Sequence, residues 1–220
     1  MDILVTGVSG FSGSHIASYL SGLKKYKIFG IYRNPKSIYL EPLKNKNNVK
    51  LVKTDLSCIS SSNLKYIKMI DHVIHVGSTS PTLNTKVIDL VQDNLIGINS
   101  LINWSIEKNC KKFIFFSSMS AFGIIKDNVV NENTPISSPD VYGQTKIISE
   151  TMLEDFKNNL EYISLRLPGI VGPKSQRNWI SQLREKLLKN EKIEIFNSTS
   201  DFNNLIHIND LSKFLENLLY

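Results

Sequence analysis

The chain has 220 residues, of which 41% are hydrophobic and 21% charged, with a net charge of +6. This composition is typical of a globular protein and excludes a disordered or fibrous chain. No apolar stretch approaches the roughly 20 residues that span a bilayer, and the first residues lack the basic-then-apolar order of a secretory signal. The two cysteines, Cys58 and Cys110, form neither a disulfide framework nor a metal-ligand pair. We therefore expect a cytoplasmic protein with no membrane segment and no metal.

The excess of basic residues is scattered along the chain. The densest group, residues 44–50, lies in a polar stretch that is typical of a solvated turn. None of the usual nucleic-acid recognition motifs is present, whereas a basic surface also attracts an anionic small molecule such as a nucleotide. The charge therefore favours a small-molecule ligand, and we expect no nucleic-acid partner.

Short apolar runs alternate with helical patterns, which is typical of βαβ units and a parallel sheet. The runs are rich in Ile, Val and Phe on successive residues, as in strands covered on both faces. Strands are predicted at residues 3–5, 28–32, 49–52, 72–76, 112–116 and 162–167. Helical spacing places Ile16, Leu20 and Leu23 on one face of a first helix and predicts a longer helix through residues 87–102. A third helix is expected over about residues 141–156.

After Pro173 the pattern becomes less regular. A helix is predicted at residues 179–188, short strands at 192–196 and 205–208, and a closing helix at 210–219. We therefore predict an α/β fold, a Rossmann-type doubly wound parallel sheet over residues 1–173 with a small C-terminal elaboration over residues 174–220. This elaboration is expected to face the substrate in part and to return to the sheet in part.

The first predicted strand runs directly into a glycine-rich turn. Gly7, Gly10 and Gly13 are spaced G-x-x-G-x-x-G, and the residues between the last two are Phe11 and Ser12. A turn without side chains brings backbone N–H groups against a pyrophosphate at a helix N-terminus, and the last glycine lets helix and strand pack closely. The strand before and the amphipathic helix after the turn favour a dinucleotide site over a glycine-rich turn with no ligand.

The residue that closes the second strand indicates which dinucleotide is bound. NAD sites place an acid there for the ribose 2′-hydroxyl, but this chain has Arg33 and no acid until Glu41. A guanidinium can bind a 2′-phosphate, which favours NADP over NAD, although NAD is still allowed; the alternative for Arg33 is a solvated turn charge. Asp55 and Leu56, after the third strand, are placed to meet the adenine, or Asp55 caps the next turn.

A second group of polar residues follows the fifth strand. Ser118 is the second residue after the predicted strand, and Tyr142 and Lys146 lie one helical turn apart, on one face of the third helix. A nearby ammonium stabilises a phenolate and lowers the tyrosine pKa from about 10 toward working pH. Tyr142 is therefore predicted to act as a general acid/base, with Ser118 orienting the substrate oxygen.

With these motifs the chain resembles the extended short-chain dehydrogenase/reductase family, the NAD(P)-dependent epimerase/dehydratases of nucleotide sugars. The resemblance runs nearly from end to end. It is carried by residues 6–13, 55–56, 75–78, 94, 117–118, 122–123, 142–150, 166–168, 172–173 and 205–211.

The resemblance implies roles for particular residues. Tyr142 would exchange a proton with a sugar hydroxyl or ketone while the nicotinamide takes or gives hydride, and Lys146 would bond the nicotinamide ribose. Asn94 would support the lysine through water; the alternative is a polar helix residue. The nicotinamide pocket would be lined by Val76, Gly77 and Pro168. His75 and His207 are expected to serve packing and hydrogen bonding, and Glu150 is expected on the helix surface.

Departures from the family pattern narrow the expected chemistry. The sugar 4,6-dehydratases of this family carry acids just after the catalytic hydroxyl, where this chain has Met119 and Ser120, so dehydration is disfavoured. Relatives bind the nucleotide phosphates with an arginine before the last strand, where this chain has Asn203 and Asn204. Lys174 and Arg177 could replace that arginine, or they are solvated loop charges.

We therefore expect an NADPH-dependent reductase of a 4-keto-6-deoxy sugar nucleotide, serving surface polysaccharide biosynthesis. The alternative is an NAD-dependent sugar-nucleotide 4-epimerase, which uses the same Tyr142 and Lys146. A hypothesis of another class is a catalytically silent NADP(H)-binding regulatory protein. Family members often pair through the long helices, here residues 86–106 and 141–156, whose partly apolar faces permit a homodimer.

Overall fold

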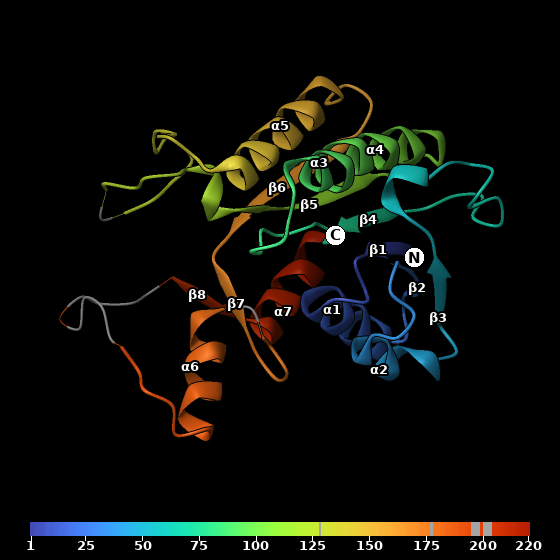
Figure 1. Cartoon of the computed structure of the whole chain (residues 1–220). Coiled ribbons are helices and arrows are strands. Elements are labelled where there is room, and N and C mark those ends of the chain that lie inside the picture. Colours follow the sequence, from blue (N-terminus) through green and yellow to red (C-terminus); the bar gives the residue numbers. More distant parts are fainter. Residues whose placement is uncertain (128, 177, 195–198, 200–203) are drawn as a thin grey trace.

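The computed structural model describes residues 1–127, 129–176, 178–194, 199 and 204–220. Its centre is a six-stranded sheet in the order β3-β2-β1-β4-β5-β6, with every neighbouring pair parallel (Figure 1). The strands are β1 (Asp2–Thr6), β2 (Lys27–Tyr32), β3 (Val49–Lys53), β4 (His72–His75), β5 (Lys112–Ser118) and β6 (Glu161–Leu167). The chain moves outward in one direction from β1 to β3 and in the other from β4 to β6. This strand order is that of a doubly wound parallel sheet, so the predicted fold class is confirmed. A sheet of this kind has its ligand crevice at the carboxyl ends of the strands, where the order reverses.

Helices cover both faces of the sheet, with α1, α2 and α7 on one side and α3, α4 and α5 on the other (Figure 1). Their bounds are α1 (Phe11–Gly22), α2 (Glu41–Lys44), α3 (Val87–Leu90), α4 (Gly97–Glu107), α5 (Val141–Asp155), α6 (Trp179–Leu188) and α7 (Ile208–Leu218). Short 3₁₀ turns occur at Ile38–Leu40, Leu56–Cys58 and Met119–Ala121. The predicted long helix over residues 87–102 is not uniform, because a π-helical segment, Val91–Ile96, joins α3 to α4. Apolar spacing cannot reveal one widened turn of this kind.

The core has two halves, one on each face of the sheet. Ile3 of β1 packs on one face with Ile16 of α1 and Leu211 of α7. Leu4, the next residue of β1, packs on the other face with Leu101 of α4. Successive strand residues point to opposite faces, and both are fully buried here, which explains why the strands read as continuous apolar runs.

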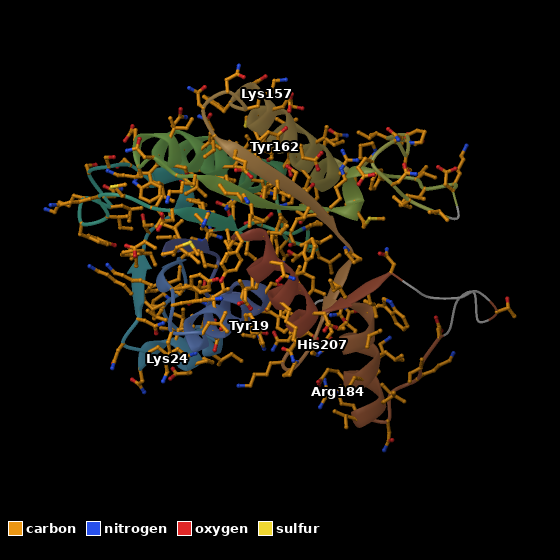
Figure 2. The ribbon with its side chains drawn as sticks, turned by 180° about the vertical axis from the view of Figure 1, so that it is seen from behind. Tyr19, Lys24, Lys157, Tyr162, Arg184 and His207 are labelled. Carbon is orange, nitrogen blue, oxygen red and sulfur yellow. The ribbon has the colours of Figure 1, made fainter. Side chains whose placement is uncertain are left out.

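The C-terminal part forms a second, small parallel sheet of β7 (Gly169–Val171) and β8 (Leu205–His207). From it α7 returns to α1, and Glu216 of α7 accepts hydrogen bonds from Tyr19 and Lys25, each at 2.8 Å. Tyr19 packs against the half of the core on this face of the sheet, whereas Tyr162 packs against the other half (Figure 2). The division predicted at residue 173 stays a prediction.

The C-terminal elements were predicted except for two strands: β7 was not expected, and the strand expected at residues 192–196 is not confirmed. The helix at 179–188 and the strand at 205–208 are confirmed, the latter ending at His207. Residues 192–194 form no strand, and residues 195–196 of the strand predicted there lie outside the described part of the chain. None of the described helices combines the length and apolar content needed to cross a membrane.

Two glycines of α1 provide a matched test of the packing between the glycine turn and this helix. A methyl group at Gly13 would lie 2.4 Å from the carbonyl oxygen of Gly7, whereas one at Gly22 would meet nothing within 4 Å. We expect Gly13→Ala to lower the free energy of unfolding by about 2 kcal/mol or more, and Gly22→Ala to raise it by up to about 1 kcal/mol. Urea unfolding of both variants measures these changes. Equal changes in the free energy of unfolding would contradict the close packing of Gly13 against the Gly7 carbonyl.

Candidate active site

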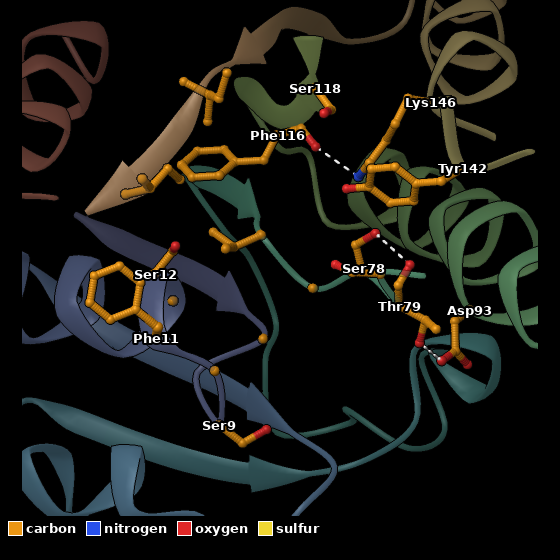
Figure 3. A pocket seen from close by; sticks show the side chains of 18 of the residues that line it. Ser9, Phe11, Ser12, Ser78, Thr79, Asp93, Phe116, Ser118, Tyr142 and Lys146 are labelled. Atoms are coloured by element: carbon orange, nitrogen blue, oxygen red, sulfur yellow. Dashed lines mark hydrogen bonds between the residues drawn. The ribbon is translucent and has the colours of Figure 1, made fainter. Parts of the chain in front are cut away.

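A cavity of about 1000 Å³ opens at the carboxyl ends of β1, β4 and β5 (Figure 3). With the exception of Asn94, every residue predicted for catalysis or cofactor binding lines it. These are Gly7, Gly10, Phe11, Ser12, Gly13, Arg33, Asp55, Leu56, Val76, Gly77, Ser118, Tyr142, Lys146 and Pro168. The fold therefore gathers residues from seven separate segments of the sequence around one cavity.

The glycine turn forms one wall of this cavity. Gly7 has a φ of +71°, and a methyl group there would lie 2.7 Å from the Cα atom of Gly77, in the segment after β4. The turn closes through a bond of 2.9 Å from the Gly10 N–H to the Gly7 carbonyl, and α1 begins directly after it. A side-chain-free cradle at the start of a 12-residue helix fits the pyrophosphate of a dinucleotide.

Thr6 and His75 join the two halves of the sheet behind the glycine turn. The Thr6 hydroxyl accepts hydrogen bonds from the backbone N–H groups of Val76 and Gly77, at 3.1 and 2.9 Å, and lies 2.8 Å from His75 Nδ1. Burial lowers the pKa of His75 to about 3, so the ring is neutral and accepts the Thr6 proton. His75 also stacks on Phe115, which confirms its predicted role in packing and hydrogen bonding.

Helix α5 brings Tyr142 and Lys146 to the end of β5. Asp140 caps the helix by accepting a bond of 2.7 Å from the Gly143 N–H. A methyl group at Gly143 would lie 2.1 Å from the Ser120 carbonyl oxygen, so this glycine allows α5 to lie directly against the turn after Ser118. Tyr142, Lys146 and Ser118 consequently face the same part of the cavity (Figure 3).

The Lys146 amine is held at a defined point below the tyrosine. Its Nζ donates a bond of 2.9 Å to the carbonyl oxygen of Phe116 and lies 5.4 Å from the centroid of the Tyr142 ring. The side chain is only 3% exposed. Burial lowers the pKa of Lys146 to about 7, and the Glu150 carboxylate acts in the opposite direction. The amine is therefore poised to change its charge near neutral pH.

Glu150 was expected on the helix surface, and this prediction is wrong. Its carboxylate accepts hydrogen bonds from the Arg166 guanidinium, including one of 2.7 Å from Nη2, and from the Ser117 hydroxyl. The Arg166 guanidinium also lies over the ring of Phe122, at 4.5 Å from the centroid. Because β6 lies beside β5, Arg166 is brought under α5, a contact that spacing along the helix could not indicate.

Asn94 is buried behind the cavity wall rather than in it. Its Oδ1 accepts bonds from the Thr79 N–H at 2.8 Å and from the Ser78 hydroxyl at 3.0 Å, and its Nδ2 donates to the Thr79 carbonyl and to Thr145 Oγ1. Asn94 thus ties the segment after β4 to α5. Its predicted support of Lys146 through water stays a prediction.

Arg33 is paired with carboxylates instead of pointing freely into the cavity. Its Nη1 lies 2.9 and 2.8 Å from the two oxygens of Asp93 and 3.5 Å from Asp55. Asp55 also accepts a bond of 3.0 Å from the Ser57 N–H, so the alternative that it caps the next turn is confirmed. Sequence reasoning missed Asp93, although an acid directly before Asn94 was visible.

The part of the cavity around Ser118 has no carboxylate among its described lining residues, as the sequence indicated. Met119 and Ser120 are part of it, and the only carboxylates among the described lining residues are Asp55 and Asp93, which lie at the opposite end with Arg33. Lys174 is not among the lining residues, and both Arg177 and Asn203 lie outside the described part of the chain. Ser175, Gln176 and Asn178, which were not predicted as site residues, form a polar wall of the cavity.

The low pKa of buried Lys146 predicts a pH-dependent stability. Because the folded value of about 7 lies below the ordinary 10.5, the unfolded chain binds more protons between these pH values. The free energy of unfolding therefore rises with pH there, by at most about 1.4 kcal/mol per unit. Lys146→Met removes this component, so its stability relative to the wild type should fall as pH increases from 7 to 9. Urea unfolding of the cofactor-free proteins tests this. A difference in the free energy of unfolding that does not change with pH would contradict the lowered pKa of Lys146.

The Glu150–Arg166 pair is expected to stabilise the fold around Ser117. The two side chains are 16% and 24% exposed, so Glu150→Gln would leave a largely buried guanidinium without its counter-charge and cost about 2 kcal/mol. The control is Lys157→Gln, which breaks the exposed pair between Lys157 and Glu154, at the C-terminal end of the same helix, and should change the stability little. Similar thermal midpoints for the two variants would contradict the proposed contribution of Glu150.

The sequence resembles known proteins over nearly its whole length. A sequence model described as the NAD dependent epimerase/dehydratase family matches residues 3–219. The "uncharacterized UDP-glucose epimerase YtcB" of Bacillus subtilis is 26% identical, over 97% of this chain and 71% of that protein. A putative UDP-glucose 4-epimerase of Methanocaldococcus jannaschii is 29% identical, over 96% of this chain and 71% of that protein. The dTDP-D-glucose 4,6-dehydratase of Dictyostelium discoideum is 28% identical, and the chain spans about half of it, 53%.

Solved structures share the fold. UDP-glucuronic acid 4-epimerase from Bacillus cereus, in complex with NAD, superposes with a TM-score of 0.89 at 24% identity, over 100% of this chain and 73% of that one. The family match, in turn, runs through the glycine turn, Ser118 and the Tyr142–Lys146 helix. The chain therefore belongs to the NAD dependent epimerase/dehydratase family, of the extended short-chain dehydrogenase/reductase type.

Proposed function

We propose that the protein is an NAD-linked epimerase that inverts C4 of the hexose in a nucleotide sugar. The observation that carries the proposal is the convergence of Ser118, Tyr142 and Lys146 in one cavity with the glycine cradle. Several relatives, including those from Bacillus subtilis and Methanocaldococcus jannaschii, are named as UDP-glucose epimerases. The cavity of about 1000 Å³ has the volume to hold large ligands.

Each of the three side chains has a defined task in such a reaction. Tyr142, in its phenolate form, removes the proton of the 4-hydroxyl and, as the phenol, returns it after the configuration has changed. The Lys146 amine, fixed by the Phe116 carbonyl, favours the phenolate form of Tyr142 when it is charged. The Ser118 hydroxyl, which accepts a bond of 3.1 Å from the Ser120 N–H, orients the sugar oxygen. Hydride removal and return at C4 is the chemistry that NAD supplies when bound.

The neutral lining around Ser118 supports epimerisation over dehydration. Elimination of water needs an acid and a base beyond the tyrosine, and Met119 and Ser120 supply neither. Epimerisation needs only the proton exchange at Tyr142, because the hydride comes back to the same carbon. The relative named as a dehydratase is therefore a weaker guide to this chain than those named as epimerases.

The reductase favoured by the sequence analysis has less support than its epimerase alternative. It depended on NADPH bound by a free Arg33, and this guanidinium is instead paired with Asp93 and Asp55. The relatives and solved structures named above are mostly epimerases, and the Bacillus cereus enzyme was solved with NAD. A nucleotide-sugar substrate and NAD as cofactor are therefore the better-supported pair.

The test is turnover of nucleotide sugars by the purified protein. With NAD present, incubation with UDP-glucose, UDP-N-acetylglucosamine or UDP-glucuronic acid should give a C4 epimer of at least one of them, followed by NMR of the sugar protons. Tyr142→Phe should lower this rate at least about 100-fold, because it removes the acid/base group, while NAD affinity stays the same. Tyr162→Phe is the matched control, since its phenol donates a hydrogen bond to Glu154, an exposed residue near the end of α5, and does not line the cavity.

Three outcomes would contradict the proposal. Stoichiometric consumption of NADPH with a keto sugar would identify a reductase. Loss of water from the sugar would identify a dehydratase. Binding of the dinucleotide without turnover of any sugar, and with no difference between wild type and Tyr142→Phe, would support the silent regulatory protein.

A further inference from the structure

The adenosine end of the cavity contains an ion pair that links two distant parts of the chain. Arg33 follows β2, at the position that contacts the ribose 2′ group in dinucleotide-binding folds. Asp93 lies in the π-helical segment Val91–Ile96, 60 residues further along the chain. Both line the cavity, so their pairing determines the charge that a bound ribose would meet there.

Asp93 is held more firmly than the arginine it binds. Its side chain is 15% exposed, compared with 63% for Arg33, and it accepts a further hydrogen bond from the Thr79 hydroxyl (Figure 3). Thr79 is itself fixed by Asn94, which bonds its N–H and its carbonyl oxygen. The position of the Asp93 carboxylate is therefore set by its contacts within the protein, and the more exposed guanidinium binds to it there.

The local charge count is unfavourable for a phosphate. Within the described residues, all ion-pair contacts of Arg33 run through Nη1 to two carboxylates, Asp93 and Asp55. One positive and two negative charges leave the site with a net charge of −1. A phosphate monoester brings about −1.5 to −2 more, and it could reach Arg33 only by displacing Asp93 or by lying beside it. A ribose 2′-hydroxyl, in contrast, can donate a hydrogen bond to a carboxylate.

We infer that Asp93 makes this site select NAD over NADP by holding Arg33, a residue that would otherwise accept the 2′-phosphate. The inference rests on the proposed dinucleotide function and extends it to a residue that contributes specificity from outside the β2 turn. Asp93 acts through Arg33 and through its own charge. Neither effect requires any change in the catalytic residues Ser118, Tyr142 and Lys146.

The experiment is calorimetric titration of the purified protein and its variants with NAD and NADP, without any sugar. The wild type should bind NAD at least tenfold more tightly than NADP. Asp93→Asn keeps the shape and an acceptor for Thr79 but removes the charge, so it should tighten NADP binding at least tenfold and should not tighten NAD binding. Adding Arg33→Ala to this variant should remove most of the gain, because the freed guanidinium is its main source. Circular dichroism melts establish that each variant is folded.

Asp89→Asn is the matched control for a general effect of charge. Asp89 lies four residues before Asp93, is exposed, and bonds the Lys86 N–H rather than Arg33. The inference is overturned if Asp89→Asn tightens NADP binding as much as Asp93→Asn, if Asp93→Asn leaves the NADP affinity unchanged, or if the wild type already prefers NADP. Absence of binding for both dinucleotides overturns it together with the proposed function. The predicted affinities without epimerisation would leave this inference standing and refute only the proposed function.

Discussion

The burial of the Lys146 amine is the constraint around which the site is built. A lysine that is 3% exposed cannot be solvated by bulk water, so its N–H groups must be taken up by the protein. The Phe116 carbonyl does this at 2.9 Å, which fixes the distance between α5 and the end of β5. Tyr142, one turn earlier in the same helix, is then held beside Ser118, the last residue of that strand.

Charge around the lysine is balanced by a second layer. Glu150, one turn later in α5, lowers the cost of a charged amine, and Arg166 neutralises Glu150 from β6. The three groups therefore alternate in charge, from the positive Lys146 at the cavity through the negative Glu150 to the positive Arg166 behind it. Removing the middle group would therefore disturb both its neighbours, which is why a residue outside the cavity matters for the protonation of the one within it.

Sequence patterns revealed the parts of the site that depend on local order. The glycine spacing, the four-residue step from Tyr142 to Lys146 and the alternation of strands and helices all follow from backbone geometry over a few residues. The contacts that were missed join residues far apart in the chain. Glu150 meets Arg166 only because β6 lies next to β5, and Asp93 meets Arg33 only because the segment after β2 and the π-helical segment border the same cavity. Nothing in the spacing of these residues distinguishes them from solvated charges.

This difference between local and distant contacts also explains why the cofactor was the weakest of the sequence predictions. An arginine after the second strand favours a 2′-phosphate only where its charge is free. The same arginine beside a preorganised carboxylate attracts a phosphate only weakly, because the negative charge of the carboxylate offsets most of the positive charge of the guanidinium. The identity of the residue at one position therefore does not determine the dinucleotide. We infer that the dinucleotide is selected by the sum of charges that the fold assembles at this end of the cavity, and in this protein Asp93 and Asp55 make that sum negative.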